Sequence, residues 1–259
     1  MEIKFNKYQG TGNDFVMIDC TGEASLEITE EVVQGLCDRR FGIGADGLIA
    51  IYEHNSYDFE MRYYNSDGSR SFCGNGARCA VAFANKLGLI DQQARFLAID
   101  GEHEASFDGT DTTLKMGDVQ QIEIRGEEYI INTGSPHYIS FVDELSTMDI
   151  VDFGKKIRYS DEFTNDGINV NLAETVERSS LSVLTYERGV EDETFSCGTG
   201  VTAVALAYAV KEELELDFEV KIKVKGGNLK VRGRRKDEGF ESIYLIGPAT
   251  FVYEGTISI

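Results

Sequence analysis

The chain has 259 residues, and its 25 Lys and Arg residues are outnumbered by 45 Asp and Glu residues, which gives a formal net charge of −20. Such an acidic chain repels nucleic acid and anionic membrane surfaces, because binding to phosphate requires clustered positive charge. Hydrophobic residues make up 42% of the sequence, so there is enough apolar material for packed cores, and the composition argues against disorder.

The first ten residues, MEIKFNKYQG, lack the basic segment and apolar run of a signal peptide, and no apolar stretch approaches the length of a membrane-spanning helix. The five cysteines are an odd number and lie far apart, which predicts reduced thiols in the cytoplasm. The three histidines, His54, His103 and His137, do not have the spacing of metal ligands, so we expect no zinc site.

Four short landmarks occur twice along the chain, in the same order. They are separated by 32, 29 and 28 residues in the first copy and by 35, 28 and 30 residues in the second. This agreement predicts an internal duplication. The landmarks are Gly12 in TGNDF and Gly134 in TGSPH, Gly44 in FGIGADG and Asn169 in DGINVNL, Cys73 in FCGNGARCAVAFA and Cys197 in FSCGTGVTAVALAYA, and the pairs Asp100-Gly101 and Gly226-Gly227.

The duplication predicts two similar domains, residues 1–118 and 119–259, although no Pro/Gly/Ser-rich linker marks the boundary between them. A duplicated scaffold without a shared site remains an alternative, because a fold does not determine a function.

Each repeated cysteine stands between a predicted strand and a predicted helix. The strands are MRYYN (61–65) and SVLTYERG (182–189), and the helices cover residues 77–84, with Gly88 as a C-cap, and residues 201–210. Neither helical run has a polar face over its central turns, and a helix that is apolar all round must be enclosed. We therefore expect an α+β fold in which each domain wraps a mostly antiparallel sheet around one buried central helix. The basic stretch 221–236 is expected to form a hairpin around Gly226-Gly227.

Cys73 and Cys197 would each lie just before a helix N-terminus. The unpaired amides of a first helical turn attract negative charge, so a thiol there ionises more readily and a substrate carboxylate can bind there. Two such helix ends meeting in an interdomain cleft would place the two sulfurs on opposite sides of one α-carbon. One thiolate would remove the α-proton while the other thiol protonates the opposite face, and aimed amide dipoles would stabilise the carbanion.

The alternative for any cysteine is a small buried hydrophobic residue. We accept it for Cys20, Cys37 and Cys79, but burial alone does not explain the matching Cys-Gly-x-Gly contexts of Cys73 and Cys197.

The sequence resembles the diaminopimelate epimerase family along essentially its whole length. The resemblance is carried by KYQGTGNDFVMID, RRFGIGADGLI, YNSDGSRSFCGNGARC, GINVNL and YERGVEDETFSCGTG. It implies interconversion of LL- and meso-2,6-diaminopimelate, a small-molecule substrate, in lysine and peptidoglycan precursor synthesis, without pyridoxal phosphate, metal or any other cofactor. The sequence leaves the assembly open, with a homodimer as one candidate.

The resemblance also implies a set of site residues. Cys73 and Cys197 would be the acid/base catalysts, and His137 and Glu187 would lie near the thiols. The reacting end of the substrate would be held by Asn13, Gly74, Asn75, Gly198 and Thr199, and the distal end by Asn65, Asn169, Glu187 and Arg188. A bidentate Arg fork suits a distal carboxylate, and Asn side chains that both donate and accept suit a zwitterion.

Three of these residues have simpler interpretations: Asn65 as a turn former, Arg188 as a surface charge and His137 as a structural histidine. The chain also departs from many family members at Ser135, where they have Asn, and from some at Gly47, where they have Gln. Ser135 is therefore a candidate supporting residue with fewer donors than an amide.

Three further functions remain as alternatives. One is a non-catalytic amino-acid-binding protein, which would bind its ligand without exchanging the α-proton. A two-cysteine racemase of the proline or hydroxyproline type would share the chemistry but would not need the distal clamp. A thiol redox switch would oxidise the two cysteines reversibly and would not isomerise an amino acid.

Overall fold

The computed structural model describes residues 2–22, 27–237 and 239–258. The chain forms two compact units, a first unit of Met1–Leu114 with Gly247–Ile259 and a second unit of Lys115–Ile246. The expected boundary between residues 118 and 119 concerns the sequence repeat and stays a prediction. The compact units divide the chain differently, because the segment from Gly247 onward belongs to the first unit.

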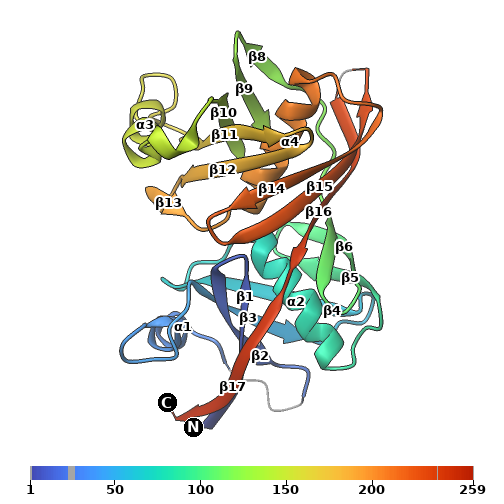
Figure 1. Ribbon diagram of the computed structural model, residues 1–259. Coiled ribbons are helices and arrows are strands. Elements are labelled where there is room, and N and C mark those ends of the chain that lie inside the picture. The colour runs from blue at the N-terminus through green and yellow to red at the C-terminus, as the bar shows by residue number, and fades with distance from the viewer. Residues whose placement is uncertain (1, 23–26, 238, 259) are drawn as a thin grey trace. The chain divides into compact units, whose positions relative to one another are not determined.

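The sheet of the first unit is mostly antiparallel, as expected. Only the β2–β3 and β4–β5 neighbours in the order below are parallel. Figure 1 shows β17 in red beside β1 in blue, and the two strands pair along most of their length. The order of neighbours is β17 (Thr250–Ser258), β1 (Glu2–Gly10), β2 (Asn13–Asp19), β3 (Gly47–Tyr52), β4 (Phe59–Asn65), β5 (Gln93–Ala98), β6 (Gly101–Phe107) and β7 (Asp111–Lys115).

The sheet of the second unit repeats this series of antiparallel and parallel neighbours. Its parallel pairs, β10–β11 and β12–β14, occupy the same places in the series. The order is β8 (Glu123–Arg125), β9 (Glu128–Asn132), β10 (Pro136–Phe141), β11 (Asn169–Glu177), β12 (Ser180–Glu187), β14 (Asp217–Val224), β15 (Gly227–Lys236) and β16 (Gly239–Pro248). A short β13 (Asp192–Thr194) pairs with the end of β12. The internal duplication is thus confirmed in the topology, and the predicted hairpin at Gly226-Gly227 is confirmed as β14–β15.

Each sheet encloses one helix, which confirms the predicted buried helices. Helix α2 (Gly74–Lys86) contacts β1, β2, β3, β4 and β6, and α4 (Gly198–Lys211) contacts β9, β10, β11, β14 and β15. From Gly74 to Ala84 every residue of α2 is buried. The expectation of an entirely apolar run was wrong at one position, because Arg78 lies within α2 and is fully buried.

Two further helices cover the sheets and are capped at their first turns. Helix α1 (Glu30–Cys37) begins after Thr29, whose side chain accepts from the Val32 amide. Helix α3 (Ile150–Arg158) begins after Asp149, which accepts from two first-turn amides. A single 3₁₀ turn, η1 (Leu145–Thr147), precedes α3. Within the described residues, no helix is long and apolar enough to cross a lipid bilayer.

The two enclosed helices end with the same hydrogen-bonding motif but with different residues. Gly88 follows α2 at φ +76°, its amide donates to Asn85 O, and the Leu89 amide donates to Ala84 O. Glu213 occupies the same place after α4 at φ 48°. Left-handed backbone costs a residue with a Cβ about 1 kcal/mol relative to glycine. The predicted Gly88 C-cap is thus confirmed, and the equivalent place after α4 is strained.

We expect Gly88→Ala to lower the free energy of unfolding by about 1 kcal/mol, because the space beside Gly88 is open and the penalty is purely conformational. The matched reverse change, Glu213→Gly, should raise it by about 0.5 kcal/mol, since Glu213 is exposed. Urea titration followed by circular dichroism measures both. If both substitutions change the free energy of unfolding in the same direction, the left-handed backbone does not control stability at these two positions.

Candidate active site

Both repeated cysteines are the N-cap residues of the enclosed helices, as expected. Cys73 has φ −134° and Cys197 has φ −118°, and the carbonyl of each accepts the first intrahelical hydrogen bond, from Ala77 and Val201 respectively. Neither sulfur makes a capping hydrogen bond to its own helix. Each unit thus presents a thiol beside amides that favour an anion.

The second glycine of each Cys-Gly-x-Gly motif lies so close to the surrounding sheet that a Cβ atom there would force a neighbouring side chain to shift. A Cβ atom at Gly200 would lie 2.6 Å from Asn171 Oδ1, and one at Gly76 would lie 2.9 Å from Ile49 Cδ1. Both distances are shorter than carbon and oxygen atoms tolerate. The glycines therefore let the first turn of each helix approach the sheet that surrounds it.

Beside Cys73, three amide and carboxylate side chains form a hydrogen-bonded chain. Asn13 Nδ2 donates to Asp46 Oδ2 at 2.7 Å, which turns Asn13 Oδ1 toward α2. That oxygen accepts from Cys73 Sγ at 3.5 Å and from Asn75 Nδ2 at 3.4 Å. The predicted residues Asn13 and Asn75 are therefore brought together with Cys73, and Asp46 was not anticipated.

An ionic network that is buried at Lys7 and exposed at Arg39 and Asp46 holds the Asn13 turn. Lys7 Nζ lies 2.6 Å from Asp14 Oδ2 and donates to Gly44 O, while Arg39 Nη2 lies 2.7 Å from both Asp14 Oδ1 and Asp46 Oδ1. Burial by itself raises the pKa of Asp14, but hydrogen bonds and charge from Arg39 and Lys7 outweigh it and lower that pKa to about 2. The network therefore contains an Asp14 that is ionised under all ordinary conditions.

Beside Cys197, a buried neutral histidine takes the place of the amide chain. Asn171 Nδ2 lies 3.1 Å from both His137 Nδ1 and Tyr138 O, so Nδ1 accepts and Nε2 carries the ring proton. Nε2 lies 3.0 Å from Thr199 Oγ1, which lies 3.5 Å from Cys197 Sγ. Burial, with a smaller contribution from Arg188, lowers the pKa of His137 to about 3, so the ring stays neutral at physiological pH.

Two of the residues predicted to hold the distal end, Asn169 and Arg188, form one cluster with the supporting candidate Ser135 in the second unit. Asn169 Nδ2 donates to Ser135 Oγ at 2.8 Å, and Asn169 Oδ1 accepts from the Arg188 amide at 2.9 Å. Arg188 Nη2 lies 3.3 Å from Ser135 Oγ, and Nη1 donates to Asp166 O. Ser135 is thus hydrogen-bonded to both other members.

Asn65 and Glu187 lie at the ends of strands β4 and β12. The Asn65 side chain donates to Ser69 Oγ at 3.0 Å and to Ser71 Oγ at 3.1 Å, so it stabilises a turn, as its simpler interpretation predicts. Glu187 O accepts two amide hydrogen bonds in the following turn. Their roles toward a substrate remain predictions.

Gly47 is the structural counterpart of Asn169, which corrects the sequence repeat that paired Asn169 with Gly44. Phe15 pairs with Gly47 as His137 pairs with Asn169 in the other unit. A Cβ atom at Gly47 would lie 2.5 Å from Tyr63 Cε2 and from Tyr64 O. The Tyr63 ring therefore fills the space that a longer side chain at this position would need.

The remaining cysteines differ from the repeated pair. Burial raises the pKa of Cys37 and of Cys79 to about 12, so neither thiol ionises near neutral pH. Cys20 is also buried, beneath α1. These environments agree with the interpretation of all three as small apolar core residues.

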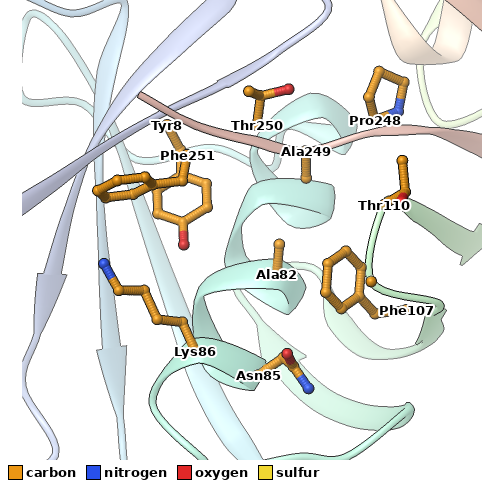
Figure 2. Close-up of a pocket in the computed structure, with 11 residues that line it drawn as sticks. Tyr8, Ala82, Asn85, Lys86, Phe107, Thr110, Pro248, Ala249, Thr250 and Phe251 are labelled. Atoms are coloured by element: carbon orange, nitrogen blue, oxygen red, sulfur yellow. The ribbon is translucent and has the colours of Figure 1, made fainter. Parts of the chain in front are cut away.

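A pocket of about 390 Å³ opens in the first unit, away from Cys73. Figure 2 shows that the pocket lies along the C-terminal half of α2. Asn85 and Lys86 line one side of it, and Pro248–Phe251 line the other. Lys86 is the charged residue among its described lining side chains, and it is already paired with Glu254 at 2.8 Å. Burial raises the pKa of Tyr8 in this lining to about 12, so neither Tyr8 nor the paired Lys86 is suited to exchange a proton near neutral pH, and the catalytic site is not placed here.

Three site residues, Asp46, Asn171 and Arg78, were not predicted from the sequence, although each stands inside one of the motifs above. Asp46 follows Gly44 in FGIGADG, Asn171 stands two residues after Asn169 on the same strand face, and Arg78 is a charge inside an otherwise apolar helix. The charge of Arg78 inside an otherwise apolar helix was the strongest of these three signals in the sequence.

We expect the ionic network to contribute to acid sensitivity. Because the folded pKa of Asp14 is about 2 and the unfolded pKa is near 4, its stabilisation is complete above about pH 4 and is lost as the pH falls toward 2. Asp14→Asn should lower stability at pH 7 by about 2 kcal/mol and flatten its loss between pH 4 and 2. Urea titrations across this range measure both, with the exposed Asp91→Asn as control. If Asp14→Asn loses stability between pH 4 and 2 as steeply as the wild type, Asp14 is not the source of this acid sensitivity.

Solved structures similar to this chain share its fold at low sequence identity. A Bacillus anthracis phenazine biosynthesis protein of the PhzF family aligns with a TM-score of 0.79 at 16% identity over all of both chains. A probable proline racemase from Agrobacterium radiobacter aligns with a TM-score of 0.70 at 12% identity, over 99% of this chain and 92% of the other. These likenesses establish the two-domain, pseudo-symmetric α+β fold.

Sequence relatives are much more similar. Diaminopimelate epimerase from Flavobacterium psychrophilum is 48% identical over 98% of this chain and 100% of its own length, and that of Chlorobaculum tepidum is 40% identical over 96% and 99%. The family profile described as diaminopimelate epimerase matches residues 5–122 and 129–252, a span that includes both thiols, both hydrogen-bonded chains and the distal cluster. The chain therefore belongs to the diaminopimelate epimerase family.

Proposed function

We propose that the protein is a diaminopimelate epimerase that interconverts LL- and meso-2,6-diaminopimelate without a cofactor. The observation that carries the proposal is the pair of cysteines at matching N-caps of two enclosed helices, in a chain whose sequence matches this family over nearly its full length. Inversion of an α-carbon requires an acid and a base on opposite faces, and a duplicated fold supplies one such group from each copy.

In this mechanism one cysteine is a thiolate and the other a thiol. The thiolate, Cys73 or Cys197 according to the direction, removes the α-proton, and the other thiol donates a proton to the opposite face. The substrate α-carboxylate accepts from the first-turn amides of Gly74, Asn75, Gly198 and Thr199. The carbanion is stabilised as charge moves onto that carboxylate, because the amide dipoles are already oriented.

The neighbouring side chains orient the two sulfurs. Asn13 Oδ1 accepts from Cys73 Sγ, so the thiol proton of Cys73 has a defined direction. Thr199 Oγ1 accepts from the neutral His137 ring, which leaves the Thr199 hydroxyl proton free to point at Cys197 Sγ. The buried His137 is a positioning residue in this proposal, because its low pKa keeps it from carrying the transferred proton.

The distal amino-acid end, which is not inverted, is assigned to the Ser135, Asn169 and Arg188 cluster, together with Asn65 and Glu187. Arg188 offers a guanidinium for the distal carboxylate, and the amide of Asn169 can donate and accept. The cluster is already cross-linked by hydrogen bonds before a substrate binds, which lowers the entropic cost of binding.

The alternatives are less well supported. The racemase of the proline type shares the fold at 12% identity, whereas the diaminopimelate epimerases share 40 to 48% of this sequence. A redox switch does not account for the preformed distal cluster. We also propose that the enzyme is cytoplasmic, where thiols stay reduced.

The decisive experiment is epimerisation of LL-diaminopimelate in heavy water. The enzyme should introduce one deuterium at the inverted α-carbon, read by mass spectrometry and proton NMR. Cys73→Ala and Cys197→Ala should each reduce inversion by at least about a thousandfold, because either change removes one of the two proton carriers.

The matched control is Cys37→Ala, which removes a buried thiol from α1 and should retain activity. Wild-type enzyme that binds diaminopimelate but takes up no deuterium would sink the mechanism. Inversion of proline, with none of diaminopimelate, would favour the racemase alternative.

The distal cluster gives a second test. Arg188→Met should raise KM for diaminopimelate by about a hundredfold, because a charge-assisted bidentate contact is worth about 3 kcal/mol. The exposed Arg178→Met, in the turn between β11 and β12, is the matched control and should not change KM. Steady-state kinetics with both variants measures KM for diaminopimelate. An unchanged KM for Arg188→Met would remove this residue from the substrate site.

A further inference from the structure

Arg78 is a fully buried cation in the second turn of the helix that Cys73 caps. Its exposed fraction is 0%, and it is among the largest fully buried side chains of the chain. Burying a guanidinium costs several kcal/mol unless a carboxylate pairs with it. No described carboxylate forms an ion pair with Arg78, and its Nε has no hydrogen-bond partner in the part of the chain that the structure describes. Such a residue needs an explanation other than stability.

The guanidinium of Arg78 has two hydrogen-bond partners, Asn75 in the first turn of α2 and Thr11 in the turn after β1. Nη1 donates to Asn75 Oδ1 at 2.9 Å, and Nη2 donates to Thr11 Oγ1 at 3.1 Å. Thr11 begins the turn that carries Asn13, and its own φ of 52° is in the left-handed region. The guanidinium therefore connects the first turn of α2 to the turn between β1 and β2.

The chemistry of its ends gives this hydrogen-bonded chain one direction. Arg78 can only donate, so Asn75 must present its oxygen to Arg78 and its Nδ2 to Asn13. At the other end the carboxylate of Asp46 can only accept, so Asn13 must present Nδ2 to Asp46. Both constraints leave Asn13 Oδ1 as the acceptor that faces Cys73 Sγ.

Arg78 also places a positive charge near this thiol. The titratable groups that interact with it are Cys79 and Cys73 on its own helix and Asp111 on β7. Burial lowers the pKa of Arg78 while these groups oppose the change, and a guanidinium remains charged in proteins. The charge is unscreened by water, so it favours the thiolate when Cys73 loses its proton.

The second unit has no such charge at the matching position. Five residues after Cys197, as Arg78 is five after Cys73, stands Thr202, whose hydroxyl donates to Gly198 O at 2.9 Å. The cation is therefore a feature of the Cys73 half alone, and packing around an enclosed helix does not require it.

We propose that Arg78 is a positioning residue for Cys73, which fixes the direction of the Asn75–Asn13 hydrogen bonds and supplies the buried charge that stabilises the Cys73 thiolate. The proposal rests on the proposed function, in which Cys73 alternates between thiol and thiolate. The proposal contains a charge effect and an orientation effect. The substitutions Arg78→Gln and Arg78→Lys distinguish the two.

The charge effect is measured without substrate, by the pH dependence of Cys73 alkylation with iodoacetamide, read at the Cys73 peptide by mass spectrometry. Arg78→Gln keeps a donor but removes the charge, so the Cys73 pKa should rise by about one unit. Arg78→Lys keeps the charge, so the pKa should stay within about 0.3 units of wild type. Arg62→Gln, at a partly exposed arginine of the same unit that pairs with Glu60, is the control and should leave both alkylation and activity unchanged.

The orientation effect is measured by steady-state epimerisation. Arg78→Lys loses the two-pronged contact to Asn75 and Thr11, so kcat should fall at least about tenfold while the alkylation pKa is preserved. A folded Arg78→Gln variant with the wild-type Cys73 pKa would overturn the proposal. If Arg78→Gln does not fold, as judged by circular dichroism, a wild-type kcat in Arg78→Lys overturns it instead. Wild-type enzyme without epimerase activity would overturn the proposed function, whereas an unshifted thiol in an active Arg78→Gln variant would overturn only the role of Arg78.

Discussion

The first turn of each enclosed helix presents backbone amides beside a cysteine that does not cap them, and the rest of the site depends on the attraction of these amides for an anion. A sulfur at the N-cap lies beside these amides, and the sheet that surrounds each helix keeps its length out of water. In a dry environment the dipoles act on a bound carboxylate with little screening. The long apolar run after each cysteine buries its helix, and this burial limits the screening of the amide dipoles in the first turn.

The two halves solve one orientation problem in different ways. In the first unit a donor-only cation and an acceptor-only carboxylate, Arg78 and Asp46, impose direction on a chain of two amides. In the second unit a buried His137, kept neutral by burial, does so through Thr199. Pseudo-symmetry of the backbone therefore coexists with different electrostatics at the two thiols. Two groups that must exchange the roles of acid and base need not have equal surroundings.

Much of this could be predicted from the sequence, because local patterns carry it. The duplication, the enclosed helices and the N-cap positions of Cys73 and Cys197 follow from repeated glycines and apolar runs. The hydrogen-bond partner of a buried polar group could not be predicted, because it is determined by tertiary contacts between distant segments. Asp46 meets Asn13 from 33 residues away, and Thr11 meets Arg78 from 67. The Tyr63 ring that excludes a side chain at Gly47 likewise has no local signal.

The edge strand of the first unit has a consequence for biosynthesis. In the second unit the corresponding strand, β8, directly precedes β9, whereas in the first unit this place beside β1 is taken by β17, whose Thr250 pairs with Gln9. On the ribosome, β8 is available as soon as β9 is made. The first unit must wait for the whole second unit to be translated before β1 gains this neighbour. The half that begins synthesis first is therefore the last to complete its sheet, and its β1 edge needs protection from other chains in the meantime.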